Sequence, residues 1–225
     1  GYLVVAQDVR GRWASEAEFV PFVHEANDGY DTIEWAARLP GADGQVGTFG
    51  FSYPGLSQLL AATLRPPSLV AMCPGFTASQ AYEGWTYRGG AFALAFAASW
   101  AIGLALDTAR RSGDDPTAER LVDAAARVQE GYRRLPLAAH DALAAADAPY
   151  YLEWLDHPSC DDYWRAIAID EDYGRITVPS LHVGGWWDVF LAGTLRNFAG
   201  LSTAGHAPQK LLVGPWAHSN WQPIG

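Results

Sequence analysis

Residues 50–55 read Gly-Phe-Ser-Tyr-Pro-Gly, and this stretch constrains the fold more than any other part of the chain. It follows a short apolar run at 46–49 and leads into an apolar segment of helical composition at 56–64. A strand, a tight glycine-flanked turn and a helix are typical of a nucleophile elbow, in which the turn projects a serine hydroxyl from the edge of a sheet. The pattern therefore predicts Ser52 as a nucleophile in an α/β fold.

The elbow departs from the general G-x-S-x-G pattern at its second glycine. Pro54 occupies the expected position and Gly55 follows one residue later. A motif this short also arises by chance, so the rest of the chain must supply the partners that a serine nucleophile needs. The helix that follows would add unpaired N–H groups and a positive dipole end, both of which favour a developing oxyanion.

Composition bounds the function before any other motif is considered. The chain has 225 residues, 49% of them hydrophobic, enough for one domain with or without an insertion. A net charge of -10 argues against nucleic acid or an anionic membrane surface as partner. Ten tryptophans suggest an aromatic-lined pocket, and two cysteines suggest free thiols in a reducing, cytoplasmic compartment. No run is long and apolar enough to span a bilayer.

The order of the remaining segments predicts a mostly parallel sheet with a helical insertion. We expect strands at 2–6, 46–49, 69–73, 178–183 and 210–213, and flanking helices at 25–39, 56–64 and 190–200. Between the third and fourth strands we expect mainly helices, at 92–111, 116–133 and 136–146. The chain then divides into a first core part (1–76), a helical cap (77–175) and a second core part (176–225).

Two late loops carry the groups that a serine nucleophile requires. In an α/β-hydrolase the order is serine, then a carboxylate, then histidine, each after a strand. Asp188 follows the strand at 178–183, and His218 follows the strand at 210–213. Taken singly, Asp188 could cap the helix that begins near residue 190, and His218 could be an ordinary loop histidine. Their joint agreement with Ser52 favours a triad.

The other polar candidates have simpler interpretations. His182 lies within a strand and is expected in the core, and the remaining histidines are expected on surfaces or loops, namely His24, His140, His157 and His206. Asp8 and Arg10 are expected to anchor a loop by a salt bridge rather than to act in catalysis. No histidine pair has metal-ligand spacing and no nucleotide-binding motif occurs, so we expect neither metal nor cofactor.

At these residues the chain resembles the acyl hydrolases that group cocaine esterase with X-prolyl dipeptidyl peptidases and α-amino acid ester hydrolases. The likeness spans almost the whole chain and is weakest between residues 105 and 150. The matching stretches are 1–11, 14–16, 18–21, 43–47, 50–55, 156–158, 185–190 and 213–220. The G-x-S-Y-x-G form at residues 50–55 is this family's own version of the elbow.

The resemblance implies roles for individual residues. Ser52 would be the nucleophile, His218 the base, Asp188 the orienting carboxylate and the Tyr53 N–H an oxyanion donor. Trp85, Trp100 and Phe190 would line the acyl pocket, whereas Phe76 and Tyr82 are better interpreted as core residues. The family also has earlier strands, a tyrosine that is the second oxyanion donor, and a C-terminal jelly-roll domain. We therefore expect this sequence to be an internal piece that is poorly soluble or inactive alone.

Three functions remain open at this point. The first is a serine esterase acting on aryl or bulky acyl esters. The second is an X-prolyl dipeptidyl aminopeptidase or an α-amino acid ester or amide hydrolase, which would need carboxylates for the substrate ammonium, with Glu83, Asp161 and Asp162 as candidates. The third is a catalytically silent fragment. The expected partners are a small-molecule ester or amide substrate and, as an open option, a second copy in a homodimer.

Overall fold

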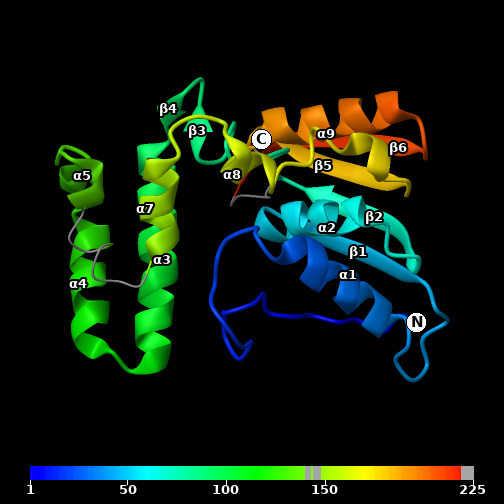
Figure 1. Ribbon diagram of the computed structural model, residues 1–225, viewed down its shortest axis with the longest axis horizontal. Helices are drawn as coiled ribbons and strands as arrows, with labels where there is room; N and C mark the ends of the chain where they lie inside the picture. Colours follow the sequence, from blue (N-terminus) through cyan, green and yellow to red (C-terminus); the bar gives the residue numbers. More distant parts are fainter. Residues whose placement is uncertain (140–142, 144–147, 219–225) are drawn as a thin grey trace.

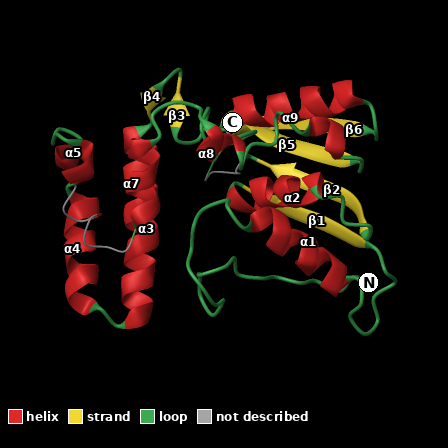
Figure 2. Cartoon of the chain, in the orientation of Figure 1, coloured by secondary structure: helices red, strands yellow, loops and turns green. Residues whose placement is uncertain are grey.

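Four parallel strands form the central sheet in the computed structural model, which describes residues 1–139, 143 and 148–218 (Figures 1 and 2). Their order across the sheet is β1-β2-β5-β6, and all three neighbouring pairs are parallel. The strands are β1 (Val46–Phe51), β2 (Leu69–Gly75), β5 (Ser180–Trp187) and β6 (Gln209–Ala217). Four of the five expected strands are therefore confirmed, together with the α/β-hydrolase fold class.

Three helices flank the sheet at or near their expected positions. They are α1 (Glu25–Ala36), α2 (Tyr53–Thr63) and α9 (Leu191–Ala204). The elbow helix α2 packs on β1 and β2, α9 packs on β5 and β6, and α1 packs on α2 rather than on the sheet itself. Leu56, Leu59 and Leu60 of α2 are buried because the helix lies between the sheet and α1. This burial fixes the position of the turn that precedes α2.

The prediction of a strand at residues 2–6 is wrong. These residues form no regular structure and are exposed, with Tyr2 98% and Val4 76% accessible. An apolar run becomes a strand only when a neighbouring strand supplies hydrogen-bond partners. Residues 2–6 pair with none of the strands in the described part of the chain. Figure 1 shows the segment running past α1 instead.

A helical region, residues 76–179, separates β2 from β5 and lies largely beyond one end of the sheet (Figure 1). The expected helix at 92–111 is observed as α3, and the one at 116–133 is divided at Arg127 into α4 and α5. Only part of the helix expected at 136–146 is described, and His140 lies outside the described residues. The elements are β3 (Tyr87–Arg88), β4 (Ala91–Phe92), α3 (Leu94–Ser112), α4 (Asp115–Ala126), α5 (Val128–Gly131), η1 (Leu137–Ala139), α7 (Pro149–Asp156), α8 (Asp162–Arg165) and η2 (Tyr173–Arg175).

The N-terminal segment ties the helical region to the rest of the molecule. The Arg12 guanidinium pairs with Asp107 of α3 at 2.6 Å and donates to the Thr108 hydroxyl at 2.7 Å. The Arg111 guanidinium lies 3.5 Å from the centre of the Trp13 ring. These contacts join residues at least 95 positions apart and hold α3 beside the loop that precedes α1. In the part of the chain that the structure describes, no helix has the length and apolar character to cross a membrane.

Candidate active site

Ser52 occupies a strained turn between β1 and α2. Its backbone angles are φ 60° and ψ -125°, a conformation that a residue with a side chain adopts only when its surroundings enforce it. The Ser52 N–H donates to the Gly75 carbonyl at 2.9 Å, which anchors the turn to β2. The two glycines are needed for space. A Cβ atom would lie 2.6 Å from Pro54 Cβ at Gly50, and 2.8 Å from the Gly75 carbonyl at Gly55.

Two buried polar residues that the sequence analysis did not identify, Gln58 and Thr77, form hydrogen bonds with the backbone of this turn. The Gln58 amide N donates to the carbonyls of Gly50 and Pro54, and its oxygen accepts from Thr48 Oγ1 at 3.1 Å. The Thr77 hydroxyl donates to the Ser52 carbonyl at 2.8 Å. The role of Gln58 could not be predicted, because the sequence around a glutamine in an apolar helix does not indicate its hydrogen-bond partners. These bonds join β1 and α2, and fix the Ser52 carbonyl.

The structure brings Ser52, His218 and Asp188 together from three distant loops. His218 Nε2 lies 2.9 Å from Ser52 Oγ, across 166 positions in the sequence. His218 Nδ1 lies 2.7 Å from Asp188 Oδ2. An ionised carboxylate only accepts, so Nδ1 carries the hydrogen and Nε2 is left to accept from the serine hydroxyl. The order serine, histidine, carboxylate is the arrangement that activates a hydroxyl group.

Asp188 has two hydrogen-bond partners, but it is not the N-cap of α9, because that position belongs to Phe190. One carboxylate oxygen accepts from His218, and the other accepts the N–H of Phe190 at 2.6 Å, just before α9 begins. Its side chain is completely buried. The bond to the backbone therefore fixes the carboxylate so that only one oxygen faces the imidazole.

The three expected pocket residues gather beside the triad. The Phe190 ring lies 5.0 Å from the His218 ring, and the Trp85 ring stacks on Phe190 at 4.6 Å. Trp100 meets Trp85 edge-on at 6.1 Å and stacks on Tyr53 at 6.3 Å. Trp85 and Trp100 come from the helical region, whereas Phe190 precedes α9. These rings form an aromatic cluster against the imidazole of His218.

Tyr53, the residue after Ser52, begins α2 and is anchored through its phenol. Its N–H is the first of α2, where helix geometry provides no acceptor, so it is available to an oxyanion. Its phenol oxygen donates to the Glu25 carboxylate and accepts the N–H of Phe22 at 3.0 Å. Burial raises the pKa of the Glu25 carboxyl, while its hydrogen bonds with Tyr53 and the backbone oppose the rise. Burial and the neighbouring carboxylate raise the pKa of the Tyr53 phenol well above 10.

Several other residues considered from the sequence lie where simple packing accounts for them. Phe76 and Tyr82 are buried, and so is His182 in β5, as expected. Burial lowers the pKa of His182. Within the described residues, no group of three or more histidine, cysteine or acidic side chains is placed to hold a metal ion.

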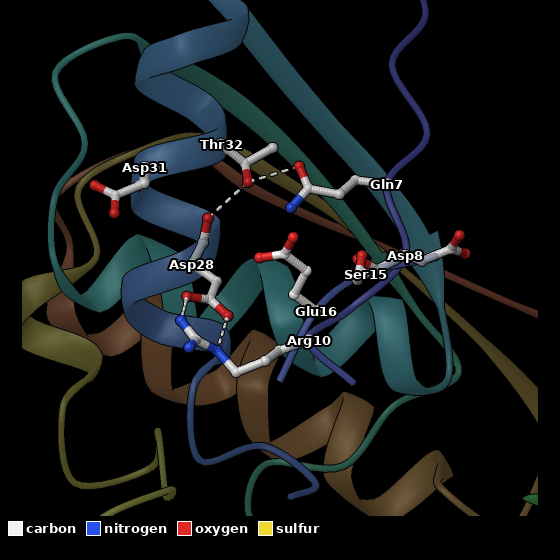
Figure 3. A pocket seen from close by; sticks show the side chains of 8 residues that line it. All are labelled: Gln7, Asp8, Arg10, Ser15, Glu16, Asp28, Asp31 and Thr32. Atoms are coloured by element: carbon white, nitrogen blue, oxygen red, sulfur yellow. Dashed lines mark hydrogen bonds and ion pairs between the residues drawn. The ribbon is translucent and has the colours of Figure 1, made fainter. Parts of the chain in front are cut away.

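An open cavity of about 260 Å³ lies between the N-terminal segment and α1 (Figure 3). Arg10 crosses it to Asp28, with two bonds of 2.9 and 2.6 Å, which confirms its role as a loop anchor. The salt bridge expected for Asp8 is not found among the described residues, where only its backbone carbonyl contributes to the loop by accepting from Ser15 Oγ at 2.7 Å. The cavity is lined by Gln7, Asp8, Arg10, Ser15, Glu16, Asp28, Asp31 and Thr32, none of which belongs to the triad or the aromatic cluster.

A parallel sheet with a strained serine elbow and a Ser–His–Asp arrangement defines the class of α/β-hydrolases. The sequence profile of the X-Pro dipeptidyl-peptidase (S15) family matches residues 1–220. The chain belongs to this family.

Relatives agree with that assignment. Cocaine esterase of Rhodococcus sp. is 35% identical over 98% of this chain and 39% of its own length. A CocE/NonD family hydrolase from Staphylococcus aureus has a TM-score of 0.67 at 23% identity, over 93% of this chain and 32% of that one. An α-amino acid ester hydrolase has a TM-score of 0.66 at 22% identity, over 95% and 37%. The chain thus spans about two-fifths of the curated relative's length.

Proposed function

We propose that this chain carries the catalytic centre of a serine esterase that cleaves carboxylic esters with aryl or bulky acyl groups. The observation that carries the proposal is the continuous chain of contacts from Asp188 through His218 to Ser52, at 2.7 and 2.9 Å. Membership of a hydrolase family and the likeness to cocaine esterase support it.

The geometry supports the following reaction. Ser52 Oγ attacks the ester carbonyl carbon while its proton passes to His218 Nε2, and the carbonyl oxygen becomes an oxyanion facing the Tyr53 N–H. His218 then gives the proton to the leaving alkoxide as the C–O bond breaks, which leaves an acyl group on Ser52. Water attacks this acyl group, its proton passes through His218 back to Ser52 Oγ, and the acid departs. Asp188 stabilises the imidazolium in both halves.

The surroundings favour a neutral acyl group over an α-amino acyl group. A substrate ammonium in a buried site needs a carboxylate partner. The three carboxylates considered for this task have other partners. Glu83 accepts the Gly89 N–H, Asp161 pairs with His157 and caps α8, and the fully exposed Asp162 lies 3.5 Å from the Arg165 guanidinium. Glu25 is buried near the cluster, but its oxygens accept from Tyr53 and the His24 N–H.

A rate comparison in the complete gene product tests this function. Aryl benzoates and acetates would be set against alanyl-prolyl and free aminoacyl anilides, with Ser52→Ala as control. Fast Ser52-dependent cleavage of the neutral esters alone is expected. A preference for substrates with a free amine would instead establish an aminopeptidase or amino-ester hydrolase. Failure of a fluorophosphonate probe to label Ser52 would establish that the fold is catalytically silent.

A further inference from the structure

We propose that Glu25 is a positioning residue for the oxyanion donor, an inference that rests on the proposed function. Glu25 touches no reacting atom, but it holds the phenol of the residue whose N–H faces the developing charge. Only one side chain, that of Tyr53, lies between this buried carboxylate and the catalytic turn.

The phenol of Tyr53 is fixed from several sides. Its hydroxyl donates to Glu25 and accepts the Phe22 N–H at 3.0 Å, so the group acts both as a donor and as an acceptor. The Phe22 ring stacks on the Tyr53 ring at 4.3 Å with an interplanar angle of 23°. Phe22 itself has φ 68°, so the loop before α1 is strained at the residue that contacts Tyr53. Glu25 also accepts the His24 N–H at 3.1 Å, which holds that loop in place.

Anchoring the phenol restricts the main chain at Tyr53. The preceding residue is held by the Ser52 N–H to the Gly75 carbonyl, and the ring at the other end is held by Glu25. The Tyr53 N–H lies between these two fixed points. An oxyanion donor contributes fully only when it is preorganised to within a few tenths of an ångström. Glu25 therefore acts on the rate of the chemical step and not on substrate binding.

Glu34 provides a matched control on the same helix. Its carboxylate also accepts from a backbone N–H and a hydroxyl, those of Ser68, at 2.9 and 3.1 Å. Ser68 precedes β2 at the end remote from the elbow, so Glu34→Gln changes a similar bond without touching the catalytic turn. Glutamine keeps the shape of glutamate, but its amide nitrogen cannot accept a hydrogen bond, so Glu25→Gln must lose the bond to Tyr53 or the bond to His24.

The experiment measures kcat and KM for an aryl ester in the complete gene product, together with the melting temperature and fluorophosphonate labelling of Ser52. Glu25→Gln and Tyr53→Phe are each expected to lower kcat about tenfold, because a small misplacement of a catalytic group has effects of this order. KM should stay within about twofold, and the double variant should be little worse than the worse single one. Glu34→Gln should leave kcat within about twofold of the original.

Three results would overturn the proposal. The first is an unchanged kcat in folded, labelled Glu25→Gln and Tyr53→Phe. The second is an equal fall in Glu34→Gln, which would assign the effect to general stability. The third is a change confined to KM, which would make Glu25 part of the binding pocket. If the unsubstituted protein is neither labelled nor active, the proposed function fails instead, so the two failures are distinguishable.

Discussion

The sheet region supplies the polar groups of the site and the ring of Phe190, whereas the helical region supplies further aromatic rings. All three members of the triad come from loops at the ends of parallel strands, and hydrogen bonds between 2.6 and 2.9 Å fix each of them. The helical region contributes Trp85 and Trp100, which make ring contacts of 4.6–6.5 Å. Hydrogen bonds weaken steeply when their distance or angle departs from the optimum, whereas apolar contacts are non-directional. Chemistry and acyl preference should therefore respond separately to substitution.

The largest expected effect follows from removing the nucleophile. Ser52→Ala in the complete gene product should lower ester hydrolysis by about 10⁵–10⁶, and adding His218→Ala should cost little more because the triad acts as a unit. Initial rates on an aryl acetate would measure both. Substantial turnover left in Ser52→Ala would place the nucleophile elsewhere and end the assignment of chemistry to the sheet region.

Asp188→Asn should have the next largest effect. The amide oxygen can still accept the Phe190 N–H, but the amide nitrogen would then face His218 Nδ1 and favour the wrong imidazole tautomer. An equivalent change in a serine protease lowers kcat about 10⁴-fold, and a similar fall is expected here with KM nearly unchanged. A fall of less than about tenfold would show that Asp188 serves chiefly to fix the turn before α9.

Much of this sheet region was predictable because its signals are local. A short apolar run, a glycine-flanked turn and an apolar helix predict the elbow without any knowledge of partners. Asp188 and His218 could be predicted because parallel strands bring their following loops to one edge. The strand at 2–6 could not be judged in the same way, because an apolar run does not reveal whether a neighbouring strand exists.

Glu25 and Gln58 show the limit more clearly. A glutamate at the start of a helix already satisfies the dipole, so its position gives no sign of a tyrosine partner 28 residues away. Likewise, nothing near Gln58 in sequence indicates its bond to the Cys73 carbonyl of the next strand. Buried polar partners are set by tertiary packing, which local patterns do not record.

Substitution in the helical region should change acyl preference and spare the chemistry. Trp100 is partly buried and stacks on Tyr53 and on Trp154. Trp100→Leu should lower the ratio of benzoate to acetate kcat/KM about tenfold, a change typical of lost pocket contacts. The acetate kcat should remain within about threefold. Trp35→Leu, at a half-exposed tryptophan on α1, is the control and should leave the ratio unchanged. Equal losses on both esters would contradict the separation.

A leucine-to-alanine substitution in each region tests whether a loss of stability also lowers kcat. Leu59 of α2 and Leu121 of α4 are both fully buried. Either leucine-to-alanine change should lower the free energy of unfolding by about 2–5 kcal/mol, through lost burial and a new cavity. Only Leu59→Ala should also lower kcat per labelled Ser52, because its helix supports the elbow. Urea unfolding and fluorophosphonate titration would measure the two effects, and an equal fall in kcat for both would show that the regions act as one.

The smallest expected effect separates the two regions by pH. Burial lowers the pKa of His182 in β5 below its ordinary value near 6.5. The unfolded chain therefore binds this proton more readily, so the stability that His182 contributes is present above pH 6.5 and is lost as pH falls toward its folded pKa. In the helical region, the hydrogen bond from His157 lowers the pKa of Asp161 below 3.8, so its contribution is lost only below that value.

Between pH 7.5 and 5.5, therefore, the contribution of His182 to the free energy of unfolding should change, whereas that of Asp161 should stay constant. Replacing His182 by glutamine removes its titration, so the original protein should lose more free energy of unfolding over this interval than His182→Gln does. The difference should be below about 2 kcal/mol, because at most one proton is taken up between pH 6.5 and 5.5 and one such proton over one pH unit corresponds to about 1.4 kcal/mol. Asp161→Asn is the control and should follow the original protein. Parallel curves for the original protein and His182→Gln would show that the buried histidine does not distinguish the sheet region in acid.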